Sequence, residues 1–291
     1  MAKFVPMTGI AKKLLALGAA LMLAAAALAA PAGAEPTGEF AEFNQCEYEN
    51  VEVSTCIHWV FDAGTIKLGE KAIPVTNPIT LQGSLLPESD LLLGATNNAT
   101  LSNTPQAVPG GLLGITAPGS WPEWLQEEFN NQINEGFTGV TATVELAGPP
   151  SGQTNVTVNT ENLIFELGTA LGLPVKIHLE NPILGGECYF GSESEPIQLN
   201  LTTGTSGAFK GSAGELMFNE PFTLIDLTNV RLVDNTFAAP SANGCGGIAS
   251  EFIDPLVDSI FGTPAGAGEN HAVLEGTFTE ADREAVLNSG P

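Results

Sequence analysis

The sequence predicts an all-β fold, mainly antiparallel and arranged as a sandwich or a barrel, with two short amphipathic helices and an N-terminal signal peptide. Apolar and polar residues alternate with a period of two in about a dozen short runs, the pattern of half-buried strands. These runs are rich in Val, Ile, Thr and Phe, and Gly, Pro and Asn interrupt them roughly every ten residues. This spacing leaves no room for the regular crossover helices of a parallel sheet.

The first element is a secretory leader at residues 1–34. It has a basic start with Lys3, Lys12 and Lys13, an apolar stretch over residues 14–30, and small residues that end at Ala34. The apolar stretch is short for a membrane span and is followed by Pro31 and Gly33 rather than by a basic stop-transfer cluster. We therefore expect export, with the protein released or associated non-covalently with the cell surface.

The mature chain is strongly acidic. The chain has 9 Lys and Arg against 33 Asp and Glu, and the leader contains three of the basic residues and none of the acidic ones. A net charge of about −27 with six scattered cations provides no basic patch for counterion exchange. We therefore expect neither nucleic acid nor an anionic membrane surface as a partner.

Four cysteines, all in the exported part, predict two disulfides. Three pairings are open, and we favour Cys46 with Cys56 and Cys188 with Cys245. In the entropic model the longer loop is worth about 4 kcal/mol and the shorter about 2 to 3 kcal/mol. The spacing between the four cysteines and the three histidines does not fit a zinc site. The acidic residues near Cys188 would raise the pKa of its thiol, so a thiolate nucleophile is not favoured. We predict no metal and no cofactor.

The expected strands occur along the whole mature chain. They begin at residues 51, 64, 78, 139, 154, 161, 173, 196, 207, 214, 222 and 271.

Two helices interrupt the strands. The first is expected to begin with a capping box formed by Ser120 and Glu123, and its apolar side contains Trp121, Trp124 and Phe129. The second spans about residues 247–261, with Pro255 inside it. We expect both helices to cap the sheet or to cover one of its edges; a lipid-facing or partner-binding face is the alternative.

Residues 87–120 are expected to form a long loop inserted in a single all-β domain at 35–291. We prefer a single domain because a first domain that ended near residue 86 would contain only about three or four strands.

Several phrases together resemble a family of secreted actinobacterial proteins that has no assigned activity. They are VPGGLLG from 108, WPEWLQEEFN from 121, GVTATVELAG from 139, LPVKIHLENPILGGECYFGS from 173, PIQLNLTTG from 196 and AAPSANGCGG from 238. The resemblance spans most of residues 50–275 and places Cys188 and Cys245 in matching phrases. It implies export and a shared fold, and no substrate.

The sequence contains no strong catalytic signature. No G-x-S-x-G elbow is present. Of the three histidines, His58 is expected to be structural, His178 to lie on the polar side of its strand, and His271 to begin a strand without a predicted partner.

Paired carboxylates are the best enzymatic candidate. Glu193 and Glu195 share a strand-like face, and Trp121 and Trp124 could form a sugar-stacking platform, as glycoside hydrolysis requires. Neither carboxyl lies in an apolar setting that would raise its pKa for acid catalysis.

We therefore expect an exported, acidic, disulfide-linked protein that binds an unknown extracellular or cell-envelope partner, or builds the cell surface, without catalysis. The alternatives are a secreted hydrolase that acts on glycans and a carrier of an apolar small ligand. An apolar pocket with few polar groups would favour the carrier, whereas two facing acids in a cleft would favour the hydrolase.

Overall fold

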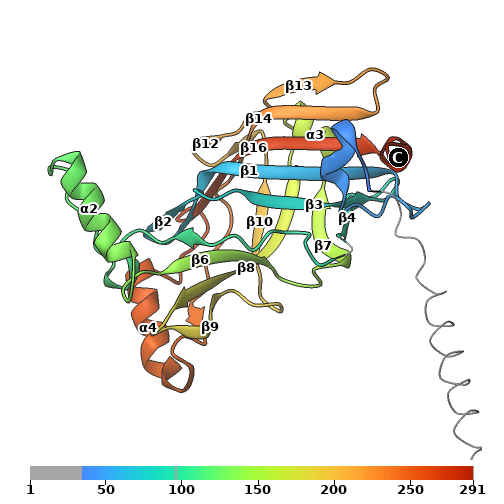
Figure 1. Ribbon diagram of the computed structural model, residues 1–291. Helices are drawn as coiled ribbons and strands as arrows, with labels where there is room; N and C mark the ends of the chain where they lie inside the picture. The colour runs from blue at the N-terminus through green and yellow to red at the C-terminus, as the bar shows by residue number, and fades with distance from the viewer. Residues whose placement is uncertain (1–34, 96, 291) are drawn as a thin grey trace, which may run out of the picture. The chain divides into compact units, whose positions relative to one another are not determined.

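A computed structural model describes residues 35–95 and 97–290 of the chain (Figure 1). The predicted leader at residues 1–34 lies outside the described residues. Residues Pro36–Gly290 form one compact unit. Among the residues that the structure describes, no helix has the length and apolar character needed to cross a bilayer.

The unit is built mainly from antiparallel strands, which confirms the all-β prediction. Fourteen strands form one sheet, and β11 and β12 form a separate two-stranded sheet. The strands are β1 (Thr55–Leu68), β2 (Lys71–Pro74), β3 (Ile79–Leu85), β4 (Leu91–Gly94), β5 (Gln106–Ala107), β6 (Thr141–Leu146), β7 (Gly152–Val158), β8 (Leu171–Asn181), β9 (Gly185–Phe190), β10 (Ile197–Leu201), β11 (Thr205–Ser206), β12 (Phe209–Lys210), β13 (Glu215–Phe218), β14 (Leu224–Asp234), β15 (Ala242–Asn243) and β16 (His271–Asp282).

The main path of the sheet runs β13-β14-β16-β1-β3-β4-β7-β8-β6-β5. Strand β8 also pairs with β10 and β9, so its two edges carry four neighbours in all. A bridge between Thr202, just after β10, and Val233 of β14 links the two halves of this path. The pairing therefore runs in a ring through β14, β16, β1, β3, β4, β7, β8 and β10.

Alternate residues of the strands are apolar, and their side chains point to one face of the sheet and form the buried core. In β10, for example, Ile197, Leu199 and Leu201 are buried while Gln198 and Asn200 are exposed. Trp59 of β1 is fully buried and meets Phe278 of β16 edge-on, with ring centroids 4.7 Å apart. Such aromatic pairs add stability beyond the area that they bury.

The helical segments are short. They are η2 (Gly38–Phe43), η3 (Gly111–Leu113), α2 (Glu123–Asn134), α3 (Thr160–Phe165), η4 (Gly247–Ala249), α4 (Ser250–Phe261) and α5 (Arg283–Asn288). Of these, η2 precedes the first strand, α5 follows the last, and the others lie between strands. The expected second helix is confirmed as η4 and α4, with Pro255 inside α4. The first helix exists as α2, but it begins at Glu123, and the side chain of Ser120 does not cap it.

Three expectations about these elements are wrong. All twelve residues of α2 are described and none is buried, so α2 does not cover the sheet; in Figure 1 it projects away from the strands. Residues 160–165, expected to be a strand, form α3 because the side chain of Asn159 accepts a hydrogen bond from the Asn162 N–H and caps the first turn. The segment at 87–120 is not one loop, since it contains β4, β5 and η3.

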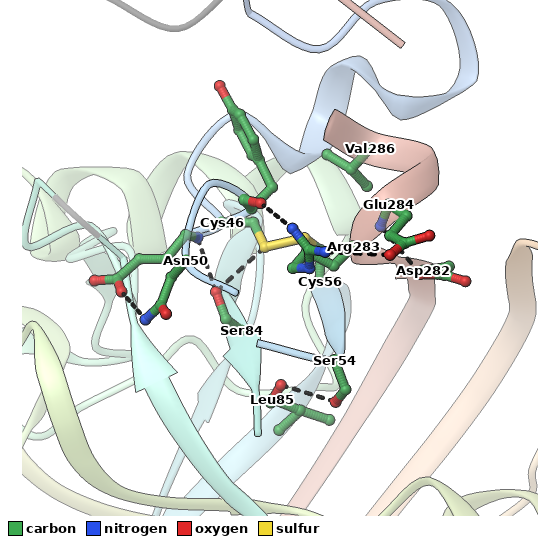
Figure 2. The surroundings of a disulfide bond; sticks show 12 residues. Cys46, Asn50, Ser54, Cys56, Ser84, Leu85, Asp282, Arg283, Glu284 and Val286 are labelled. Atoms are coloured by element: carbon green, nitrogen blue, oxygen red, sulfur yellow. Dashed lines mark hydrogen bonds and ion pairs between the residues drawn. A yellow bond between two sulfur atoms is a disulfide. The ribbon is translucent and has the colours of Figure 1, made fainter. Parts of the chain in front are cut away.

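The N-terminal disulfide joins the segment after η2 to the start of β1, at one end of the sheet (Figure 2). Cys46 and Cys56 are bonded, as expected. The Ser84 hydroxyl of β3 accepts a hydrogen bond from the Glu47 N–H at 2.8 Å, and Arg283 of α5 donates to the Tyr48 carbonyl at 3.1 Å. The disulfide therefore joins a segment that strand and helix contacts also hold in place.

Candidate functional site

An apolar groove of about 270 Å³ opens between α4 and the segments that face it. Its lining residues come from η3, the segment before β6, the turn between β8 and β9, and α4. They are Leu112, Leu113, Phe137, Thr138, Ile183, Leu184, Ile253, Leu256, Val257 and Ile260. The structure thus brings together four stretches of chain that are far apart in the sequence.

The wall formed by α4 is held from both ends. The Asp254 carboxylate accepts a hydrogen bond from the Cys245 N–H at 2.8 Å. Asp258 accepts from the Ala242 N–H at 2.8 Å and from the Thr263 hydroxyl at 2.7 Å. Asp254 and Asp258, which the sequence places among apolar residues, therefore fasten the helix instead of facing a ligand.

The second disulfide lies behind this wall. Cys188 of β9 is bonded to Cys245, as expected, and both are fully buried. Phe190 of the same strand packs on Phe261 at the end of α4, with ring centroids 4.9 Å apart. The sheet, the disulfide and α4 therefore form one connected support for the groove.

The opposite wall uses its polar atoms internally. Thr138 is the one polar residue among the described lining residues, and its hydroxyl donates to the Ile133 carbonyl at 2.8 Å. Its own carbonyl accepts from the Leu112 N–H at 2.8 Å. A Cβ on Gly111 would lie 2.2 Å from that carbonyl oxygen, so only glycine permits this approach. The groove therefore presents apolar surface to any occupant.

The apolar surface continues beyond the groove along α4. Leu256 and Phe252, four residues apart on α4, are 53% and 78% exposed, and Ile248 of η4, just before α4, is fully exposed. Residues four apart share one side of a helix. Exposed apolar side chains in a contiguous row are typical of binding surfaces.

The two tryptophans expected to face a ligand lie at the start of α2. Trp124 is 68% exposed, whereas Trp121 is partly covered by Phe129, with ring centroids 5.5 Å apart. Neither tryptophan is among the residues that line the groove.

The expected carboxylate pair is not assembled. Glu193 and Glu195 are both exposed, but they line different hollows. Glu193 shares a hollow of about 220 Å³ with Glu145, Lys176 and two asparagines. Glu195 lies beside Pro196, Pro240 and Pro264. Their spacing of two predicted that Glu193 and Glu195 share one face of a strand. The residues between β9 and β10 instead form a tight turn, in which the two side chains point in different directions.

Glu145 is the carboxylate that the sequence analysis missed. It contacts Lys176 at 3.5 Å and the His178 Nδ1 atom at 3.3 Å. His178 alternates with buried residues as expected, but it is largely covered because it stacks on Tyr189 at 4.5 Å. Burial raises the pKa of Tyr189, and the charges of Glu145, Glu187 and Glu180 raise it further. Cross-strand pairing of β6, β8 and β9 creates this cluster.

A second cluster brings together an acid, an imidazole and a hydroxyl. The His58 Nδ1 atom lies 3.2 Å from Glu42 of η2, and the Thr279 hydroxyl donates to the His58 carbonyl at 3.0 Å. Burial raises the pKa of Glu42, but hydrogen bonds from His58 and Thr279 outweigh it, so the net effect is a lowered pKa. In a hydrolytic triad the imidazole lies between hydroxyl and acid. Here the carboxylate is the shared partner, so His58 is not placed to activate Thr279.

The remaining histidine, His271, begins β16 and does have a neighbour, the Phe209 ring at 4.5 Å. Burial lowers its pKa, and the charge of Lys67 lowers it further. Over the part of the chain that the structure covers, no group of three or more His, Cys, Asp or Glu residues could hold a metal ion.

No protein-family model, curated protein or solved structure matches this chain. The resemblance to secreted actinobacterial proteins therefore stays a prediction.

Proposed function

We propose that this protein is an exported binding protein whose groove takes the alkyl chain of an apolar ligand. The observation that supports this most strongly is the lining: nine of the ten lining residues are apolar, and the tenth, Thr138, has its polar atoms bonded inside the protein. Binding pockets for small molecules are mostly apolar and largely preformed. Among the lining residues, no polar group is free to bind a ligand head group, so the bound part of the ligand is a hydrocarbon chain.

Export is part of the same proposal. The leader pattern at residues 1–34 and two buried disulfides fit an oxidising compartment outside the cytosol. An acidic chain of this kind stays soluble by self-repulsion while it presents an apolar surface. A carrier or receptor for an apolar ligand at the cell surface combines these properties.

The size of the groove limits its occupant. At about 270 Å³ it lies near the lower end of the ~300 to 1,000 Å³ range of ligand pockets, so it holds one chain rather than a bulky ring system. Each buried CH₂ contributes about 0.8 kcal/mol, which is roughly a fourfold change in Kd. The affinity should therefore rise with chain length until the groove is full.

The test is displacement of a fluorescent single-chain probe, cis-parinaric acid, by straight-chain primary alcohols of increasing length. We expect Kd to fall roughly fourfold per CH₂ and then to level off. Leu256→Glu should weaken binding by at least about tenfold, because it places a charge in the groove. Leu216→Glu on β13 is the matched control, since Leu216 is also partly exposed, at 39%, and lies outside the groove. Equal effects of the two variants, or no dependence on chain length, would overturn the proposal.

A further inference from the structure

A second hollow, of about 340 Å³, lies where β16 is flanked by irregularities in both neighbouring strands. On one side, the register of β1 shifts between Phe61 and Ala63, so Asp62 has no partner on β16. On the other side, the register of β14 shifts between Leu227 and Val230. Bulges re-aim side chains and are common next to binding and active sites.

The backbone around this hollow is specialised. A Cβ on Gly276 would lie 1.8 Å from the Val60 carbonyl oxygen, so only glycine fits between the two irregular strands. Asn229 has a φ of 58°, a left-handed conformation that non-glycine residues seldom adopt. Strained positions of this kind cluster at functional sites. The two irregularities lie at the same level of β16 and together open the sheet surface.

The hollow offers hydrogen-bonding groups that the protein does not use. Within the described chain, the side chains of Asp62, Thr228, Asn229 and Thr277 line the hollow and make no hydrogen bond to another residue. They comprise a carboxylate acceptor, two hydroxyls and an amide, so both donors and acceptors are present. Ala63 adds a small apolar surface to the hollow.

The charges of the hollow exclude several ligand classes. Its one cation, Arg231, is already paired with Glu275 and donates to the Lys210 carbonyl at 3.2 Å. With Asp62 unpaired, the lining has a net negative charge, which disfavours phosphates and carboxylates.

We propose that this hollow binds a saccharide ring. A sugar hydroxyl both donates and accepts hydrogen bonds, which matches the free hydroxyls, amide and carboxylate, and Ala63 can contact the C–H face of the ring. A volume of 340 Å³ accommodates one or two rings at the low end of the ~300 to 1,000 Å³ range. The open, polar site binds weakly, with Kd of about 1 mM.

The test is a titration of the ¹⁵N-labelled mature protein with maltotriose, cellotriose, mannotriose and N,N′,N″-triacetylchitotriose. We expect saturable shifts of amide signals at residues 62, 228–231 and 275–277 with at least one of them. Asp62→Asn and Thr277→Val should each weaken binding about tenfold, because each removes a hydrogen bond to the ligand. Thr65→Val, the same change as Thr277→Val at a half-buried position of the neighbouring strand β1 outside the hollow, is the control and should leave Kd unchanged.

Two outcomes would overturn this inference. One is the absence of saturable shifts with all four trisaccharides at 20 mM concentration, taken as about twenty times the expected Kd. The other is binding of spermidine in their place with a strong salt dependence, which would identify an amine site centred on Asp62. The inference is independent of the apolar groove, so Leu256→Glu should leave the saccharide titration unchanged.

Discussion

Asp254 accepts a hydrogen bond from the Cys245 N–H at 2.8 Å, and this contact ties the helix that lines the apolar groove to a buried disulfide. One further contact strengthens the link. The Gly246 N–H donates to the carbonyl of Leu184, which itself lines the groove. The shape of the groove therefore depends on the covalent bond behind it.

The first prediction concerns this disulfide. Replacing both Cys188 and Cys245 by Ser opens a loop with a sequence separation of 57 and should cost about 4 kcal/mol of unfolding free energy. The melting temperature should fall by ~10 °C, and binding of alkyl chains should weaken. Thermal unfolding followed by circular dichroism checks the first effect, and probe displacement checks the second.

The Cys46–Cys56 disulfide is its matched control. Its separation is only 10, so the double Ser variant should lose less, about 3 kcal/mol, and should keep the affinity for alkyl chains. An equal loss of binding in both variants would mean that general destabilisation, and not the support of the groove, explains the effect.

The second prediction concerns Asp226, whose Oδ1 atom is buried without a hydrogen-bond partner in the described structure. Burial raises the pKa of Asp226, and the charge of Glu42 raises it further. The ionised form is therefore disfavoured in the folded state, and stability should rise as pH falls through the raised pKa towards the unfolded value near 3.9. Asp226→Asn should raise the melting temperature at pH 7 by ~1 to 3 °C, and this gain should vanish below about pH 4.

Glu42→Gln should have the opposite sign. The pKa of Glu42 is lowered on balance, so its ionised form contributes stability above the unfolded value near 4.3, and this is lost as pH falls through the folded pKa. The variant should melt below the parent protein at pH 7 and match it in acid. Parallel pH profiles for Asp226→Asn and Glu42→Gln would refute the assignment.

The third prediction concerns Gly276. A Cβ there would meet backbone atoms of β1, which cannot move aside as a side chain can. Gly276→Ala should therefore cost at least about 3 kcal/mol in chemical unfolding. Gly186→Ala on β9 is the control: nothing lies within 4 Å of its added Cβ, and we expect a change below about 1 kcal/mol.

The fourth prediction addresses catalysis. Glu145 and Glu193 line one hollow, but Lys176 and His178 hold the Glu145 carboxylate. We expect nitrophenyl glycosides to be hydrolysed at the same background rate by the parent protein and by the Glu145→Gln/Glu193→Gln variant. Hydrolysis by the parent that this double variant abolishes would establish a glycosidase.

The strands and disulfides could be predicted from local patterns. Alternation located β6, β8, β10 and β14. The even cysteine count predicted two disulfides, and the pairing favoured among the three open ones is the one observed. The strand expected at 161 was wrong because the Asn159 cap outweighs its apolar content. Strand β9 was missed because its first residues are Gly185 and Gly186, which are typical of turns.

The groove could not be predicted in the same way. Leu112, Phe137, Ile183 and Leu256 meet only after the sheet has formed, and no periodicity within one segment records that contact. The sequence instead favoured Trp121 and Trp124, because two neighbouring aromatic side chains could stack on a sugar. The structure places them at the start of α2 and just before it, outside the groove, and buries no residue of that helix.

The most direct test of the central claim is photoaffinity labelling of the mature protein with a twelve-carbon alkyl diazirine, followed by peptide mapping. The account predicts adducts at residues 112–113, 137–138, 183–184 and 253–260, and their loss when excess dodecanol is present. Adducts concentrated on the exposed apolar hairpin at 215–228, or a pattern that dodecanol does not change, would contradict it.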